Sequence, residues 1–189
     1  MREQECRHEK TNEEWNIVEV LSHSRHDWMN KLQLLKGNIT LNKYDRVQQI
    51  IEEIVIESQN ESKLCNLKML SFASMLMTFN WHRHQYALEY EVLGTACDLS
   101  ELDQTATDWC GHFFQILDDA ADRCAENHMS ITIETEANQR QARFFFDFNG
   151  IITDKALLLN WLKANEQSGV EVKHYELSPN ELTVAVELA

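Results

Sequence analysis

Apolar residues recur every three or four positions along the first part of the chain, and this spacing restricts the segment to a helix. The pattern turns helical from about Thr11. Its apolar positions are Val18, Leu21, Trp28, Leu32, Leu35 and Ile39. Because an α-helix has about 3.6 residues per turn, these side chains share one narrow face, with Arg25 at the skipped position. The chain has only five glycines and one proline, so little interrupts long helices.

A second apolar seam follows a short LNKYD connection at residues 41–45. It uses Val47, Ile50, Ile51, Ile54, Leu64 and Leu67. Two long helices with so short a connection predict an antiparallel hairpin. One hairpin leaves its seam uncovered, whereas two hairpins together form a four-helix bundle. We therefore expect a homodimer formed by a hairpin domain at 12–68, after a flexible N-terminus at 1–11.

The rest of the chain, residues 69–189, mixes helical and alternating patterns. Helices are predicted at 69–85, 101–126 and 154–166, and strands at 86–93, 131–133, 144–146, 170–177 and 181–188. This order predicts a C-terminal α/β sandwich and an α+β fold class overall. The run Phe144-Phe145-Phe146 is typical of a strand buried on both faces.

Charge and cysteine usage exclude several classes of protein. The chain has 17 Lys and Arg against 31 Asp and Glu, a net charge of −14. Nucleic acids and anionic membranes bind dense basic surfaces, so neither is expected as a partner.

The start, MREQECRHEK, is no secretion signal, and no apolar stretch is long enough for a membrane helix. Five scattered cysteines without a CxxC pair indicate free thiols, so we expect a cytoplasmic protein.

A polar stripe runs along the first predicted helix, turned away from the apolar seam. It consists of Ser22, His26, Asn30, Gln33 and Gly37. Between Leu21 and Arg46 there are five basic residues and two acidic ones, so this region is basic within an acidic chain. Such a surface suits an acidic partner or a phosphoryl group, although an ordinary solvated helix face is the alternative. His23 is the rival histidine, but it lacks the following Asp and the Asn four positions later.

The side chains around His26 suit phosphoryl transfer. A neutral imidazole is a nucleophile at one nitrogen if the other nitrogen is oriented. Asp27 can orient the ring or take its proton, and Asn30 can bind a phosphoryl oxygen or water. Arg25 and Lys31 can offset the phosphoryl charge. These four residues are therefore hypothesised to assist His26.

The segment SRHDWMNKLQLLKGN, followed by KYDRV and ESKLCNLK, resembles the sporulation initiation phosphotransferase B family of spore-forming bacilli. The segments TFNW, LEYEVLG, DLS and ENH extend the resemblance over nearly the whole chain. The spacing His-Asp-x-x-Asn-x-Leu-Gln is also similar to the phosphoacceptor box of the related sensor histidine kinases.

The resemblance implies a dimeric hairpin bundle with a C-terminal domain descended from a kinase ATP-binding domain. It also implies a function in the sporulation phosphorelay. His26 would take a phosphoryl group from an aspartate of a single-domain response regulator and pass it to an aspartate of the sporulation transcription regulator. Ser22, Lys31, Gln33 and Gly37 would contact these regulators.

A true ATP-dependent histidine kinase is the competing enzyme. Asp119 stands where the kinase pattern has its Asn, and the segment Phe146–Gly150 keeps only Asp147 and one glycine of a glycine box. After Gly150 only Gly169 remains, so no second glycine box exists. We therefore expect no cofactor or metal bound by this chain, with Mg²⁺ supplied by the regulator.

A non-catalytic dimeric adaptor for response regulators is the non-enzymatic alternative. It would explain the basic region, but not the His-Asp-x-x-Asn spacing.

Two further features have simpler explanations than a functional site. His82 and His84 suggest a metal site less well than a solvated helix end, since residues two apart diverge on a helix. Cys110, near His112, lies in an apolar helix and is expected in the core.

Overall fold

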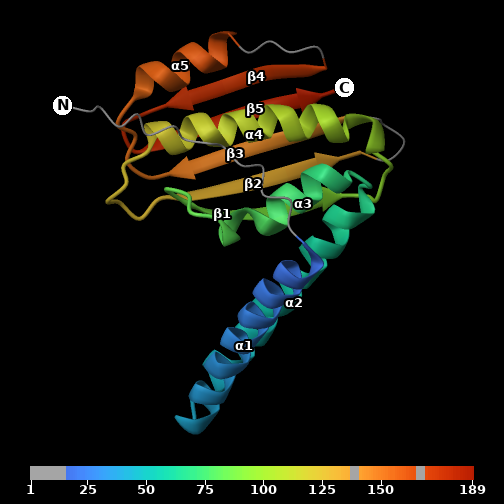
Figure 1. Ribbon diagram of the computed structural model, residues 1–189, viewed down its shortest axis with the longest axis vertical. Helices are drawn as coiled ribbons and strands as arrows, with labels where there is room; N and C mark the ends of the chain where they lie inside the picture. Colours follow the sequence, from blue (N-terminus) through green and yellow to red (C-terminus); the bar gives the residue numbers. More distant parts are fainter. Residues whose placement is uncertain (1–15, 137–140, 165–168) are drawn as a thin grey trace, which may run out of the picture. The chain divides into compact units, whose positions relative to one another are not determined.

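The computed structural model describes residues 16–136, 141–164 and 169–189 (Figure 1). Contacts divide the chain into two compact units, Met1–Glu52 and Glu53–Ala189. The flexible N-terminus predicted at 1–11, and the first residues of the hairpin domain predicted at 12–68, lie outside the described residues.

The first unit contains helix α1 (Ile17–Thr40) and the beginning of helix α2 (Tyr44–Asn66). The predicted start near Thr11 is not where α1 begins, because Asn16 caps it. The Asn16 Oδ1 accepts hydrogen bonds from the backbone N–H groups of Val18 and Glu19, both at 3.0 Å. The Glu19 carboxylate accepts the Asn16 N–H at 3.1 Å, which completes a capping box.

The turn between the helices is set by Asn42, whose φ of 56° lies in the left-handed region. The Lys43 N–H donates to the Asn38 carbonyl at 2.9 Å, and the Asn42 N–H donates to the Ile39 carbonyl at 3.0 Å. These two bonds form a Schellman motif, for which asparagine is the usual substitute for glycine. A short connection is therefore confirmed, but it spans 41–43 rather than the predicted 41–45, because Tyr44 and Asp45 already belong to α2.

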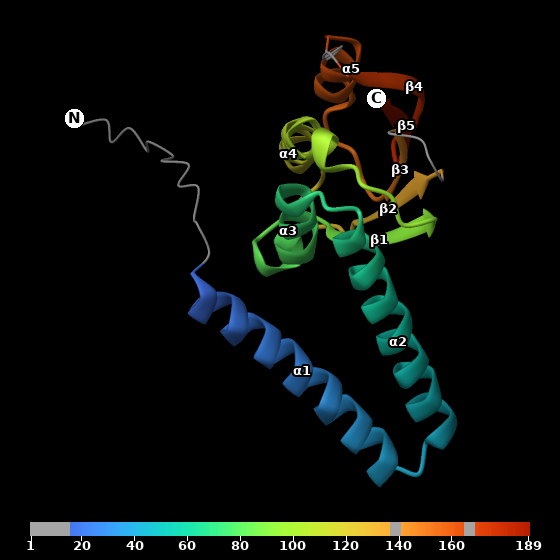
Figure 2. The ribbon, with the colours of Figure 1, turned by 90° about the vertical axis from the view of Figure 1, so that its right-hand side faces the viewer.

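The second unit is a five-stranded sheet with helices on one face (Figures 1 and 2). The helices that cover this face are α3 (Leu70–Thr78), α4 (Asp103–Ala120) and α5 (Lys155–Ala164). The strands are β1 (Ala87–Gly94), β2 (His128–Thr135), β3 (Ala142–Asn149), β4 (Val170–Leu177) and β5 (Glu181–Leu188). Their order is β1-β2-β3-β5-β4, with β1 and β2 parallel and the other pairs antiparallel. The predicted α+β fold class is confirmed.

The core lies between the sheet and its helices. Phe144, Phe146 and Phe148 point into it from β3, whereas Phe145 is 38% exposed on the opposite face. The prediction of a strand buried on both faces is therefore wrong, because helices cover only one face of the sheet. Cys110 is fully buried, as predicted, and burial raises the pKa of its thiol far above the ordinary value.

The last turns of α2 belong to this core. Leu64 and Leu67 are fully buried and join the same hydrophobic cluster as α3 and the sheet. This packing explains why the compact second unit begins inside α2, at Glu53.

Two helices end earlier than the sequence pattern predicts. The helix predicted at 69–85 is α3 followed by a 3-10 turn, Phe79–Trp81, and residues 82–86 lead into β1. The helix predicted at 101–126 ends at Ala120, preceded by a 3-10 turn at Ser100–Leu102. The Thr153 N–H donates to the Ala120 carbonyl at 2.7 Å, so a distant segment replaces the next helical turn.

Candidate functional site

His26 lies in the middle of α1 with its side chain 74% exposed. Its ring nitrogen Nδ1 lies 3.2 Å from the Asn30 amide nitrogen Nδ2 and 3.6 Å from the Asp27 carboxylate. Residues four apart lie one above the other on a helix, which brings Asn30 over the ring. Both neighbours lie at Nδ1, so Nε2 is the ring nitrogen available to an incoming group.

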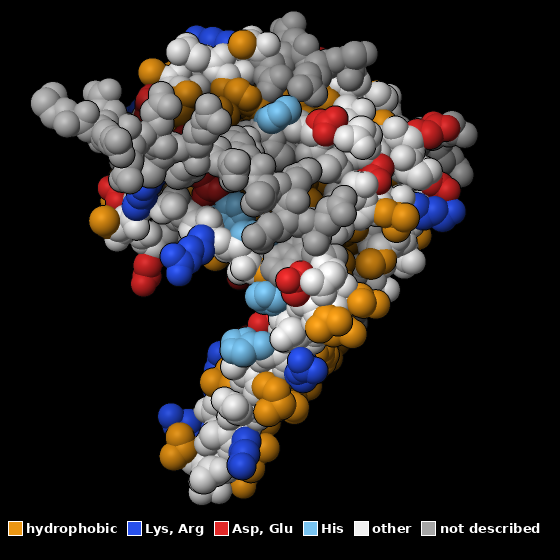
Figure 3. All heavy atoms as spheres, in the orientation of Figure 1, with side chains coloured by type: hydrophobic (Ala, Val, Ile, Leu, Met, Phe, Trp, Pro, Cys, Tyr) orange, Lys and Arg blue, Asp and Glu red, His pale blue; other side chains and the backbone are white. Residues whose placement is uncertain are grey.

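The other predicted site residues lie along the same helix. Ser22, Arg25, Gln33 and Gly37 are exposed, and Lys31 is half-buried with its ammonium 5.6 Å from the centre of the Trp28 ring. The structure thus brings Asp27 and Asn30 to His26, and places the others on the helix around it. Histidine, basic and hydrophobic side chains all appear on the hairpin surface in Figure 3. The roles predicted for these residues stay predictions.

Gly37 occupies an open position on the polar stripe. A Cβ built there would have no neighbouring atom within 4 Å in the described chain. A glycine inside a helix costs about 0.5–1 kcal/mol relative to alanine. Packing within the described chain therefore gives no reason for this glycine.

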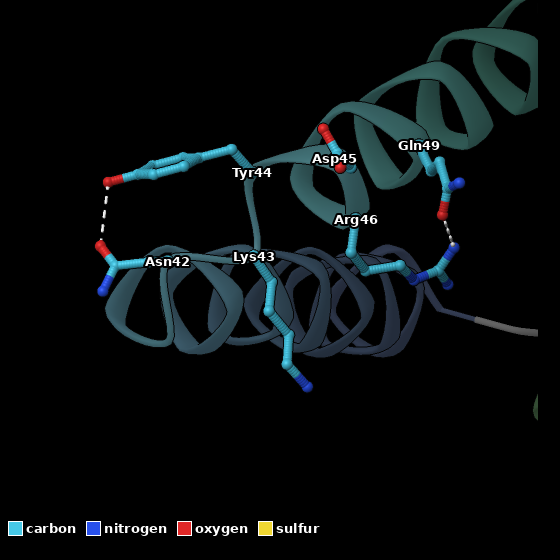
Figure 4. Close-up of a pocket in the computed structure, with 6 residues that line it drawn as sticks. All are labelled: Asn42, Lys43, Tyr44, Asp45, Arg46 and Gln49. Carbon is cyan, nitrogen blue, oxygen red and sulfur yellow. Dashed lines mark hydrogen bonds between the residues drawn. The ribbon is translucent and has the colours of Figure 1, made fainter.

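The hollow at the turn of the hairpin lies away from His26. It has a volume of about 440 Å³ and is lined by Asn42, Lys43, Tyr44, Asp45, Arg46 and Gln49 (Figure 4). The Tyr44 hydroxyl donates to the Asn42 Oδ1, and the Arg46 guanidinium donates to the Gln49 Oε1, both at 3.2 Å. Figure 4 shows these side chains spread around the turn rather than directed at one point. The end of α1 is about 20 Å along the helix from His26.

A second hollow, of about 560 Å³, lies in the second unit between α2, α3 and β1. Its lining includes Glu53, Glu57, Glu61, Glu89 and Tyr90. Burial, followed by the charges of Glu61, Cys65 and Glu57, raises the pKa of the Tyr90 phenol well above its usual value. Its acidic lining disfavours a phosphoryl group, so this hollow does not rival the surface around His26.

His84 is a structural residue rather than part of a solvated helix end. Its Nδ1 lies 2.5 Å from the Asp118 Oδ2, and its ring stacks on Phe79 with centroids 3.7 Å apart. The Gln85 N–H donates to the other oxygen of Asp118 at 2.8 Å. No sequence pattern indicates this pair, because the two residues belong to segments 34 positions apart. The described residues contain no group of three or more His, Cys, Asp or Glu side chains arranged to hold a metal ion.

Asn127, which the sequence analysis missed, joins the ends of the two segments that resemble kinase boxes in sequence, at Asp122 and Ile151. Asn127 is 7% exposed, and its amide nitrogen donates to the Gln85 and Asp122 carbonyls, both at 2.8 Å. Its Oδ1 accepts the Ile151 N–H at 2.9 Å. A Cβ at Gly150 would lie 2.3 Å from that oxygen, so the retained glycine makes room for Asn127. Asp119 and Asp147 are exposed and take no part in this junction.

Two family descriptions together match almost the whole chain. Residues 68–189 match "Sporulation initiation phospho-transferase B, C-terminal", and residues 7–67 match "sensor kinase SpoOB-type, alpha-helical domain". The sporulation initiation phosphotransferase B of Bacillus subtilis is 42% identical over 172 residues, which cover 91% of this chain and 89% of that protein.

The chain belongs to the sporulation initiation phosphotransferase B family. It is accordingly a phosphotransferase, and the family resemblance seen in the sequence is confirmed. In the described residues, no helix is long and apolar enough to cross a membrane.

Solved histidine kinases show a weaker likeness. The Acinetobacter baumannii kinase AdeS is 9% identical with a TM-score of 0.38, over 87% of this chain and 97% of that one. The kinase ThkA, solved in complex with the response regulator protein TrrA, is 15% identical with a TM-score of 0.36, over 90% and 60% of the two chains. The family assignment rests on the sequence matches.

Proposed function

We propose that the protein is a phosphorelay phosphotransferase in which His26 carries the phosphoryl group between two response regulators. The observation that supports this most directly is an exposed imidazole with both polar neighbours at Nδ1. Family membership supplies the class of reaction. The donor is an aspartyl phosphate of a single-domain regulator, and the acceptor is an aspartate of the sporulation transcription regulator. The proposal places the protein in the cytoplasm with these regulators.

Helix α1 positions His26, and the regulator supplies the Mg²⁺ ion. His26 sits in the middle of a capped helix of 24 residues, which fixes its direction toward an incoming receiver domain. In-line transfer places the donor oxygen, the phosphorus and Nε2 in a row. The Mg²⁺ that offsets the phosphoryl charge binds oxygen ligands, so we assign it to the regulator's acidic pocket.

The exposed apolar face of the hairpin supports a homodimer. Leu21, Trp28 and Leu32 on α1 are at least half exposed, and Ile51 on α2 is 48% exposed. Large continuous apolar surfaces are uncommon on monomers. A two-fold dimer would cover this face with the same face of a second copy and would carry two His26 sites.

The polar stripe forms the proposed regulator-binding surface. Ser22, Gln33 and Gly37 lie along it, and the open space at Gly37 allows a regulator backbone to approach closely. Arg25 and Lys31 add positive charge that attracts an acidic receiver domain.

The test is transfer of label from an aspartyl-phosphorylated, radiolabelled regulator in the presence of Mg²⁺ and without ATP. The natural chain is compared with His26→Ala, and His23→Ala is the matched control three residues earlier on α1. We expect rapid, reversible, acid-labile labelling that is lost only in His26→Ala. Equal labelling of the His26→Ala protein would disprove the assignment of His26.

The same assay separates the two alternatives. Label acquired from ATP but not from the regulator would identify an autokinase. Label from neither source, combined with full relay function of His26→Ala in cells, would identify a non-catalytic adaptor.

A further inference from the structure

The contacts of the His26 ring raise the question of which nitrogen carries its proton. The Asn30 amide nitrogen, Nδ2, lies 3.2 Å from Nδ1, within hydrogen-bond distance, whereas the Asp27 carboxylate lies at 3.6 Å, beyond it. Asn30 is therefore the residue that bonds to Nδ1.

The tautomer of His26 decides whether its Nε2 can attack. A neutral imidazole carries one N–H, and only the nitrogen without it has a free lone pair. If Asn30 donates its amide N–H to Nδ1, the ring proton sits on Nε2 and attack from Nε2 is blocked. If the amide is turned by 180°, its carbonyl oxygen accepts Nδ1–H, and Nε2 keeps its lone pair. The two orientations occupy the same space, because the amide oxygen and nitrogen are nearly equal in size.

We infer that Asn30 is a positioning residue whose amide carbonyl accepts Nδ1–H and so holds His26 in the tautomer with a nucleophilic Nε2. This inference rests on the proposed function, and it replaces the direct contact with a phosphoryl oxygen that the sequence predicted for Asn30. Asn30 acts through His26 in this scheme.

The transfer step then needs no movement of a proton. The Nε2 lone pair forms a bond to phosphorus as the bond between phosphorus and the aspartyl oxygen breaks. The electron pair of the broken bond remains on the aspartate, which leaves as a carboxylate. The phosphorylated ring becomes a cation with Nδ1–H still donated to the Asn30 carbonyl. The return step to the second aspartate reverses these changes, so one arrangement serves both directions.

An amide suits this position better than a carboxylate. A carboxylate also accepts Nδ1–H, but its negative charge would repel the phosphoryl group as the group approaches the ring. Asn30 accepts the hydrogen bond without that charge, while Asp27, half exposed, stays beyond hydrogen-bond distance.

The test measures the tautomer and the transfer rate separately. Nitrogen NMR of the full-length protein with ¹⁵N-labelled histidine distinguishes Nδ1–H from Nε2–H, and His26→Ala identifies the signal among the eight histidines. Asn30→Leu removes both polar atoms with little change in shape, and Asn30→Asp keeps only the acceptor. Asn38→Leu is the matched control, since Asn38 lies further along α1 and donates to the Leu34 carbonyl.

We expect the Nδ1–H tautomer in the natural chain, in Asn30→Asp and in Asn38→Leu, and a shift toward Nε2–H in Asn30→Leu. The maximal transfer rate of Asn30→Leu should fall by about twofold to about tenfold, the range for one net hydrogen bond, at unchanged half-saturating regulator concentration. An Nε2–H tautomer in the natural chain, or the same tautomer in Asn30→Leu, would overturn the inference. A rise in the half-saturating concentration alone would also overturn it, because Asn30 would then contact the regulator.

Failure of the proposed function gives a different result. If the natural chain takes no label from the regulator, the function is wrong whatever the NMR shows. If it takes label normally while the tautomer does not respond to Asn30, only the role of Asn30 is wrong.

Discussion

The two compact units differ in how much of their apolar surface they bury themselves. Ile50 is the only buried side chain among residues 16–52, whereas the second unit has a continuous core of buried aliphatic and aromatic residues. His26 belongs to the unit that buries little. This difference is the reason for which we propose that a partner surface covers the hairpin.

Substitutions in the core of the second unit should lower the free energy of unfolding most. Phe144→Ala removes a fully buried ring that stacks on Phe72 and should lower the free energy of unfolding by about 3–5 kcal/mol. Phe145→Ala, the neighbour on the open face, should cost less than about 1 kcal/mol. Urea unfolding of both variants measures the contrast, and equal losses would contradict the one-sided burial of β3.

The second-largest loss of stability is expected at the hydrogen-bonded junction around Asn127. Asn127→Ala leaves the Ile151 N–H and the Gln85 and Asp122 carbonyls without their partner, which should destabilise the second unit by about 1–3 kcal/mol. Thermal unfolding measures the loss. Asp119→Ala, an exposed substitution on the adjacent helix, is the control and should change little. A stable Asn127→Ala protein would mean that other bonds already hold the junction.

Substitutions on the apolar face of the hairpin should weaken the proposed dimer. Leu32→Ala removes an apolar side chain that is exposed in one chain and that we place in the dimer interface, which should weaken association by about 2 kcal/mol per subunit. Sedimentation of dilute samples measures the dissociation. Phe145→Ala removes an exposed apolar side chain from the second unit and should leave the dimer intact. If both variants dissociate, or neither does, the dimer does not form through the α1 seam.

Two substitutions at Gly37 should affect the stability of α1 and the rate of phosphoryl transfer differently. Because the position is open in the described chain, alanine should stabilise the helix by about 0.5–1 kcal/mol. Gly37→Leu should add no strain to the chain but should hinder a regulator that approaches closely. Helix unfolding and the transfer assay are measured together. Unimpaired transfer by Gly37→Leu would remove Gly37 from the proposed binding surface.

The smallest effect is expected from the exposed Lys68–Asp98 pair, with nitrogen and oxygen 2.7 Å apart. Hydrogen bonds from the Lys68 side chain, and then from Ser100, lower the pKa of the Asp98 carboxyl from 3.8 to about 2. A lowered folded-state pKa gives stability that is present above about pH 4 and is lost as the pH falls toward 2. Asp98→Asn should therefore be slightly less stable than the natural chain at pH 7, and the difference should shrink as the pH falls from 4 through 2. The midpoint of urea unfolding across this range measures the difference, and a constant difference would exclude the pair as its cause.

Local spacing was a good guide wherever residues close in the chain decide the outcome. The hairpin, its short turn, the strands and the polar stripe follow from period and turn residues. The i, i+4 spacing also anticipated that Asn30 would lie beside His26, although it did not show that the amide faces Nδ1.

The sequence by itself determined the α+β class, the helix carrying His26 and the family of the protein. Only the tertiary structure decided that Phe145 faces outward, that α4 ends at Ala120, and that His84 pairs with Asp118. It also decided that Asn127 joins three distant segments. The periodicity and spacing of residue types reflect contacts between residues that are close in the chain. These other features depend on which face of the sheet is covered and on hydrogen bonds between segments 24 to 42 positions apart.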